Sequence, residues 1–189
     1  MTSSFLVTIM QLDEALFTMI NGQWTHPWAN VILPWMRDSN HWFPFYVLLI
    51  AYLFYVKGWA AWKWVVAAIV NVTLTDQISS SLFKPFFHRL RPCADPLMIH
   101  KVKLLLDHCS SGFSFTSSHA ANHIGIAMFM AITLKPYLKN YRYLFFLWAG
   151  IIAYAQIYVG VHYPLDIIVG AFIGVIVGWV CAKFYLKYT

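Results

Sequence analysis

The sequence has few charged residues, and this scarcity excludes most classes of soluble protein. Of its 189 residues, 11% are charged and 60% are hydrophobic, whereas a soluble domain averages about 25% charged residues. Despite a formal net charge of +6, there is too little polar surface for a nucleic-acid-binding domain. The composition predicts an integral membrane protein whose basic residues face lipid head groups or an anionic substrate, with no nucleic acid as a partner.

Cysteine is also scarce, which limits the metal and redox chemistry to expect. The three cysteines are Cys93, Cys109 and Cys181, and without a C-x-x-C pair a cysteine-based zinc or redox motif is not expected. The N-terminus has no basic region, and Asp13 and Glu14 interrupt its apolar run. A cleavable signal peptide is therefore not predicted.

What the chain does contain is a series of long apolar segments, which predict an all-α, polytopic membrane helix bundle. Since a helix needs about 20 apolar residues to cross the hydrocarbon core, about five full transmembrane helices are expected in one domain over residues 1–189. They lie near residues 41–57, 62–83, 117–134, 143–161 and 165–182. Residues 5–21 carry acidic side chains and predict an interfacial or partial-span helix, and residues 27–37 predict a short helix or a re-entrant segment.

The basic residues are distributed unequally over the two sides of this bundle. One side, with short loops and the C-terminal tail, holds Lys57, Lys63, Lys135, Lys139, Arg142, Lys183 and Lys187 and no acidic residue. The positive-inside rule places this side in the cytoplasm. The long loop 84–116 and the turn 161–165 then face outward, and all eight histidines lie on or near that outer side.

The segment KPFFHRLRP offers cations at the outer end of the second apolar run. Lys84 and Arg91 bracket His88 and Arg89. A basic helix end that reaches for lipid head groups would have the same composition, but the cluster lies on the less positive side. Arginine forks and lysine ammonium groups are the usual partners of phosphate.

The segment FSFTSSHAANH predicts a capped helix start with two histidines. Thr116, Ser117 and Ser118 suit an N-cap, and free amides at a helix N-terminus bind anions. His119 would face that site, and His123 follows four residues later on the same helix face. This spacing can bind zinc, but no glutamate accompanies it as in H-E-x-x-H, so no metal or other cofactor is expected.

A third cluster joins His162 and Asp166 on either side of Pro164, which suits the start of a helix. A carboxylate four residues from an imidazole can accept its N–H and fix its tautomer. A satisfied polar pair at a helix end is the alternative interpretation. Asp76, on the polar face of the second apolar run, is expected to support the site or to pair with polar neighbours inside the bundle.

In order and spacing, these three clusters resemble the motifs of the type 2 phosphatidic acid phosphatase superfamily, which includes bacterial membrane lipid phosphatases and vanadium haloperoxidases. K-x6-R-P is matched by Lys84 through Pro92, P-S-G-H imperfectly by Thr116 through His119, and S-R-x5-H-x3-D by Ala155 through Asp166. Residues 84–166 carry the three motifs.

The resemblance implies a metal-independent phosphatase with a phosphohistidine intermediate. His162 would be the nucleophile, Asp166 would hold its imidazole, and His119 would protonate the leaving oxygen and then activate water. Lys84, Arg91, Ser117 and the amide of Ser118 would hold the phosphate.

Two departures from the family pattern affect the phosphate site. The Ser-Arg pair of the third motif is Ala155-Gln156 here, and Ser118 stands in place of a glycine. Gln156 can donate hydrogen bonds but carries no charge, so the loss should cost about tenfold in activity or more, unless Arg89 or His88 compensates. An active enzyme is expected, with a protein that binds phosphate without catalysis as the alternative.

The family analogy suggests undecaprenyl diphosphate as the first choice of substrate, with lipid A phosphate and phosphatidylglycerophosphate as close alternatives. The expected location is a bacterial inner membrane, with the site facing the periplasm and a membrane lipid phosphate as the partner. Because that compartment is oxidising, Cys93 and Cys109 are expected to form a disulfide. The competing classes are a metal-dependent transporter or intramembrane protease that uses His119 and His123, and a non-catalytic phospholipid-binding protein. The oligomeric state does not follow from the sequence.

Overall fold

The chain folds into a helical bundle, described here over residues 2–189 from a computed structural model. No strand occurs within that range. Short 3₁₀ and π segments link several helices, and the π segment Ile78–Phe83 joins α4 to α5. The helices are α1 (Thr2–Thr18), α2 (Ala29–Arg37), α3 (Phe43–Lys57), α4 (Ala61–Gln77), α5 (Lys84–Phe87), α6 (Ser118–Thr133), α7 (Lys135–Leu138), α8 (Leu144–Tyr158) and α9 (Pro164–Tyr188).

The five long apolar segments expected from the sequence correspond to α3, α4 with its π extension, α6, α8 and α9. The last helix runs six residues beyond the apolar pattern, to Tyr188, because Lys183, Leu186 and Lys187 are good helix formers although two of them are charged. Within the described residues, two helical stretches are long and apolar enough to cross a membrane, Ser39–Ala94 and Pro164–Tyr188.

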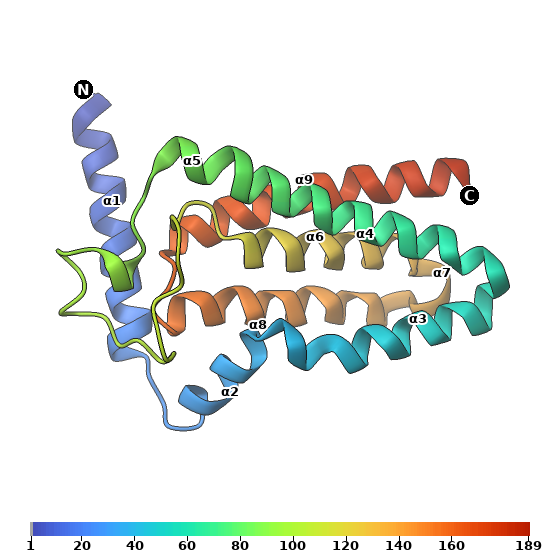
Figure 1. Cartoon of the computed structure of the whole chain (residues 1–189), viewed down its shortest axis with the longest axis horizontal. Coiled ribbons are helices and arrows are strands. Elements are labelled where there is room, and N and C mark those ends of the chain that lie inside the picture. The colour runs from blue at the N-terminus through green and yellow to red at the C-terminus, as the bar shows by residue number, and fades with distance from the viewer. Residues whose placement is uncertain (1) are drawn as a thin grey trace.

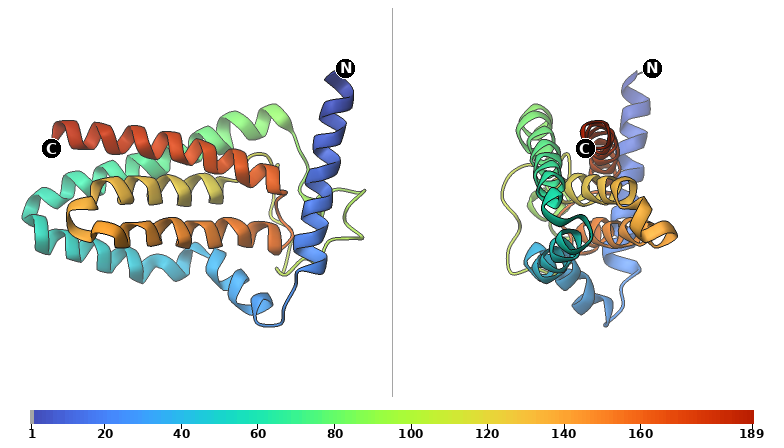
Figure 2. Two further views of the ribbon diagram at one scale, coloured as in Figure 1. Left: turned by 180° about the vertical axis from the view of Figure 1, so that it is seen from behind. Right: turned by 90° about the vertical axis from the view of Figure 1, so that its right-hand side faces the viewer.

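The long helices lie roughly side by side, and α1 stands across one end of them (Figure 1). Figure 2 shows the same crossing from behind, with the loop between α5 and α6 gathered at that end. The short helix α7 and the C-terminus lie at the opposite end (Figure 1). The loop, the start of α6 and the turn between α8 and α9 therefore meet beneath α1.

A row of glycines lets α6 and α9 approach closely. A Cβ atom at Gly170 would lie 2.6 Å from the carbonyl oxygen of Ser117, and one at Gly174 would lie 2.5 Å from that of Ala121. Gly178 continues the row one turn further along α9. Small residues at this spacing let helix backbones pack together in membranes. The contact fixes the start of α6 against the second and third turns of α9.

The loop between α5 and α6 is held by a disulfide and by the bundle. Cys93 and Cys109 are joined, with their Cα atoms 5.8 Å apart, and Cys93 is buried against Val159 and Val161 of the α8–α9 turn. The Leu105 amide donates to the Val159 carbonyl. These contacts bring the residues after Cys109 next to the turn that carries His162.

Candidate active site

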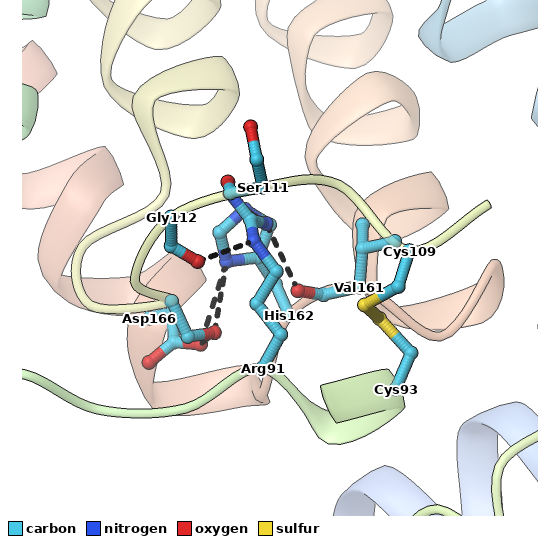
Figure 3. The surroundings of a disulfide bond; sticks show 9 residues. Arg91, Cys93, Cys109, Ser111, Gly112, Val161, His162 and Asp166 are labelled. Carbon is cyan, nitrogen blue, oxygen red and sulfur yellow. Dashed lines mark hydrogen bonds and ion pairs between the residues drawn. A yellow bond between two sulfur atoms is a disulfide. The ribbon is translucent and has the colours of Figure 1, made fainter. Parts of the chain in front are cut away.

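The imidazole of His162 lies buried in the turn between α8 and α9, and Arg91 contacts its Nε2 atom. Arg91 Nη1 is 2.9 Å from His162 Nε2 (Figure 3). A guanidinium can only donate, so Nε2 is unprotonated and accepts this hydrogen bond with its lone pair. The ring proton is therefore on Nδ1. This is the tautomer that a nucleophile at Nε2 needs.

Asp166 and Ser114 hold the other side of the ring. Asp166 Oδ2 is 3.4 Å from His162 Nδ1, and Ser114 Oγ lies 3.3 Å from the same nitrogen while donating to that carboxylate. Burial lowers the pKa of His162 to about 4, although Asp166 opposes this shift. The imidazole is thus neutral near pH 7, oriented by a carboxylate and a hydroxyl.

Arg91 is itself held by backbone carbonyls of two segments. Its Nε donates to the Gly112 carbonyl and its Nη2 to that of Ser111, while Nη1 also donates to the carbonyl of Val161. The side chain is almost fully buried. Figure 3 shows it between the disulfide-bonded loop and the α8–α9 turn. A phosphoryl group that reaches Nε2 of His162 must therefore contact this guanidinium.

The N-terminus of α6 supplies amides and a second histidine. Ser117 caps the helix by accepting from the Ala120 amide, and its own amide donates to the Asp166 carbonyl. The first intrahelical bond, from Ala121 to Ser117, leaves the amides of Ser118 and His119 without an acceptor among residues 2–189. Such a helix start attracts anions. Ser117 thus joins the start of α6 to α9, and the two amides are left available to a ligand.

Lys84 and His119 present side chains that are not consumed by protein contacts. Across the described chain, neither the Lys84 ammonium nor the His119 imidazole has a hydrogen-bond partner. The charge of Lys84 nevertheless acts on both His119 and His162, so the three groups are near one another. Both side chains are thus available to a ligand.

The remaining predicted residues lie around this cluster with different partners. Asp76 accepts from Asn122 Nδ2 and from Ser80 Oγ, so it pairs with polar neighbours inside the bundle. His123 contacts the carbonyl of His119 through Nδ1. His88 is exposed and packs edge-on against Phe113, with ring centroids 4.7 Å apart. Within residues 2–189 no group of three or more His, Cys, Asp or Glu side chains forms a potential metal site.

Comparison with known proteins decides the family. Residues 61–189, more than half of the chain, match the PAP2 superfamily. The chain belongs to the PAP2 superfamily. It is 33% identical to a lipid A 4'-phosphatase of Porphyromonas gingivalis over 181 residues, which cover 94% of this chain and 75% of that protein. A lipid A 4'-phosphatase of Bacteroides thetaiotaomicron is 30% identical over 174 residues, which cover 90% of this chain and 76% of that protein.

A solved PAP2 structure shares the fold. The transmembrane PAP2-type phosphatidylglycerolphosphate phosphatase of Bacillus subtilis superposes with a TM-score of 0.73 at 21% identity. The superposition covers 96% of this chain and 88% of that one. The bundle described above is therefore the PAP2 membrane fold, and the chain is a membrane PAP2 phosphatase.

The departure from the PAP2 pattern at Gln156 is accompanied by a cation from another helix. Gln156 is fully buried on α8, and its Oε1 accepts from Nε of Arg37, 3.2 Å away. The sequence suggested Arg89 or His88 as the compensating charge, and the structure gives neither a contact with Gln156. Arg37 lies 119 positions away in the chain, and only the packing of α2 against α8 brings the two together.

Arg89 instead ties the PAP2 site to α1. Its Nη2 is 2.6 Å from Asp13 and its Nη1 is 2.9 Å from Asp166, and its guanidinium lies over the Tyr163 ring. Asp13 also accepts from the Leu165 amide at 2.7 Å, which satisfies a donor in the first turn of α9. From the sequence alone, Asp13 was expected only to interrupt an apolar run.

Three residues that the structure adds to the site are thus Asp13, Arg37 and Ser114. For Arg37 the sequence held a usable signal, because the missing motif arginine implies another cation at the site end of the bundle, and Arg37 lies at that end. Ser114 stands two residues before the second motif, and Asp13 is an acidic residue in an apolar segment. Neither of these features predicts a partner by itself.

Proposed function

We propose that this PAP2 phosphatase removes a phosphomonoester from a glycolipid of the lipid A type through a phosphohistidine at His162. The observation that carries the proposal is the state of His162. Its Nε2 is unprotonated and accepts from Arg91, while Nδ1 is held by Asp166 and Ser114. A neutral, oriented imidazole next to a cation has what a phosphoryl transfer through histidine needs.

The reaction follows from the roles of two histidines. His162 Nε2 attacks phosphorus, the N–P bond forms, and the ester P–O bond breaks. His119 enters as the imidazolium, gives its proton to the leaving alkoxide and becomes neutral. A water molecule then attacks the phosphohistidine, His119 accepts its proton, and the P–N bond breaks to release phosphate. Lys84, Arg91 and the amides at the start of α6 offset the negative charge on the phosphoryl oxygens.

An apolar groove supports a lipid as the substrate. It has a volume of about 460 Å³ and lies between α3, α4 and α6, lined by aliphatic residues such as Ile50, Ala68 and Val72. Asn122 and His123 line it as well, and they lie within a helical turn of His119 on the same helix. An acyl chain in the groove would leave its phosphorylated head at the start of α6.

For the membrane, we propose five spans, α3, α4, α6, α8 and α9, with the site at the outer face of a bacterial inner membrane. Helix α1 lies across the bundle at the site end (Figure 1) and exposes apolar side chains such as Phe5, Met10 and Leu16. This suits a helix in the membrane interface. The basic residues of the short loops gather at the opposite end, as the positive-inside rule requires.

As the candidate substrate, we rank lipid A ahead of undecaprenyl diphosphate, which was the first choice from the sequence. The curated relatives described above are lipid A 4'-phosphatases, and the fold neighbour is a phosphatidylglycerolphosphate phosphatase. Phosphatidylglycerophosphate is thus the second candidate substrate.

The test is phosphate release from a panel of pure lipids by the detergent-purified protein. Lipid A, phosphatidylglycerophosphate and undecaprenyl diphosphate are compared at equal concentration, with His162→Ala as the control, and mass spectrometry locates the phosphate lost from lipid A. We expect lipid A to react fastest and to lose one phosphate. Faster release from undecaprenyl diphosphate would overturn the substrate assignment, and release by His162→Ala would overturn the mechanism.

Chelation and acid-quench trapping separate the competing classes. Full activity in EDTA is expected of a metal-independent PAP2 phosphatase. Activity lost in EDTA and restored by zinc would point to the metal-dependent alternative through His119 and His123. A phosphohistidine trapped in the wild type and absent in His162→Ala argues against a protein that only binds phospholipid.

A further inference from the structure

We infer that Arg37 of α2 is a phosphate-binding residue of this enzyme and that Gln156 holds it in place of the missing motif arginine. The inference rests on the proposed function and adds a residue from outside the three motifs. Arg37 then binds the substrate phosphate, and glutamine is tolerated at position 156 because it positions Arg37.

The contact between the two residues orients the guanidinium without consuming it. Arg37 uses Nε toward Gln156 Oε1, and in the described part of the chain its terminal nitrogens Nη1 and Nη2 donate to no other residue. Gln156 also turns its amide nitrogen toward the Ile152 carbonyl, 3.5 Å away. The amide oxygen is thereby left for Arg37. Two N–H groups on one side of a planar fork suit a phosphate oxygen pair.

The position of Arg37 matches the rest of the site. Its charge acts on both His119 and Arg91, so Arg37 lies near both residues. Asp38 follows it in sequence but forms no ion pair with it among residues 2–189; its carboxylate accepts from the Asn40 amide instead. The guanidinium is half-buried at the end of α2, where a ligand can reach it.

Among the described residues, no other arginine at this end is free to replace the motif arginine. Arg89 is bound by Asp13 and Asp166. Arg91 already donates hydrogen bonds to three backbone carbonyls and to His162. Lys84 belongs to the first motif and contributes a single ammonium. Arg37 is thus the additional fork that the third motif lacks.

The first experiment measures binding of inorganic phosphate, which does not depend on the identity of the lipid. The stabilisation of purified protein by phosphate is titrated for wild type, Arg37→Ala and Arg142→Ala. Arg142 is a matched control because it is also half-buried but lies at the opposite end of the bundle, beside Tyr143. We expect Arg37→Ala to weaken phosphate binding about tenfold to a hundredfold and Arg142→Ala to leave it unchanged. Equal binding by Arg37→Ala and wild type would overturn the inference.

The second experiment moves the guanidinium back to the motif position. Gln156→Arg alone places two arginines together and removes the acceptor of Arg37, so we expect lower activity. The double variant Arg37→Gln, Gln156→Arg restores one arginine and one glutamine and should recover activity above that of Arg37→Gln. A structural role of Arg37 would give no such recovery. A double variant no more active than Arg37→Gln, although folded by gel filtration, would contradict the inference.

The two proposals can fail separately. Phosphate binding that depends on Arg37, in a protein that releases phosphate from no lipid of the panel, would overturn the proposed function and leave the inference intact. Lipid hydrolysis that is unaffected by Arg37→Ala would support the function and overturn the role of Arg37.

Discussion

Arg91 Nη1 lies 2.9 Å from His162 Nε2, so the cation of the first motif contacts the nitrogen of the third motif that we propose as the nucleophile. The two residues are 71 positions apart. The contact requires Nε2 to be unprotonated, since arginine has no acceptor. Nε2 is therefore unprotonated in the absence of substrate, with its lone pair directed at Arg91.

The protonation state of His162 gives the first prediction. Its pKa, lowered to about 4 by burial, means that the ring stays neutral as the pH falls through the usual histidine range near 6.5 and takes a proton only near pH 4. Histidine NMR on labelled wild-type protein should show one imidazole resonance that titrates near pH 4. The same resonance should be absent from the spectrum of His162→Asn, which assigns it to His162. Titration near 6.5 would show that the site does not hold the neutral form.

Removing Asp13 should loosen α1 from the site. Asp13 is buried and accepts from both Arg89 and the Leu165 amide, so Asp13→Ala leaves two donors without their acceptor. Loss of one partner from a buried ion pair costs about 3–5 kcal/mol, and we expect a lower melting temperature together with reduced activity. Asp13→Asn keeps an oxygen for the Leu165 amide and should be less harmful. Equal melting temperatures for wild type and Asp13→Ala would refute the role of this contact.

Two glycine-to-alanine substitutions should change stability in opposite directions. A Cβ at Gly174 would lie 2.5 Å from the Ala121 carbonyl oxygen, whereas one at Gly150 meets nothing within 4 Å. Gly174→Ala must push α9 from α6, which costs about 1–3 kcal/mol. Gly150→Ala should stabilise by about 0.5–1 kcal/mol, since alanine favours a helix. Thermal unfolding in detergent checks both signs, and a stabilised Gly174→Ala protein would contradict the close packing.

Filling the apolar groove should affect lipids more than soluble phosphates. Ala68 lines the groove between α3, α4 and α6, and its neighbour Ala67 lines a separate groove formed by α4 and α9. Ala68→Phe should raise KM for lipid A and leave KM for a short-chain phosphate nearly unchanged. Ala67→Phe is the matched control and should behave as wild type. The same increase in KM for lipid A in both variants would contradict the proposal that this groove binds the lipid chain.

Breaking the Cys93–Cys109 disulfide should act on Arg91 through the loop. The bond closes a loop with a sequence separation of 16, and a closure of that length contributes about 3 kcal/mol in the entropic model. Ser111 and Gly112, whose carbonyls hold Arg91, lie two and three residues after Cys109. Cys93→Ser with Cys109→Ser should lower the melting temperature and raise KM. Reducing agent should do the same to wild type and leave the double variant unaffected, whereas an unchanged wild type would contradict this role.

The sequence by itself determined the helical class, the helix positions and the residues of the motifs. These features are local: apolar runs of span length, capping residues and short spacings such as His162 to Asp166 depend on neighbours in the chain. The extension of α9 to Tyr188 was missed because charged helix formers end an apolar pattern without ending a helix.

The tertiary structure alone decided which distant side chains complete the site. Arg37 reaches Gln156 across 119 positions, and Asp13 reaches Leu165 across 152. Neither pair has a periodic or local signal, because each contact depends on how α2 packs on α8 and how α1 crosses the bundle. A single sequence reveals which motif residues are present and that the arginine of the third motif is missing. Only the packing of the helices decides which other side chain lies at that position.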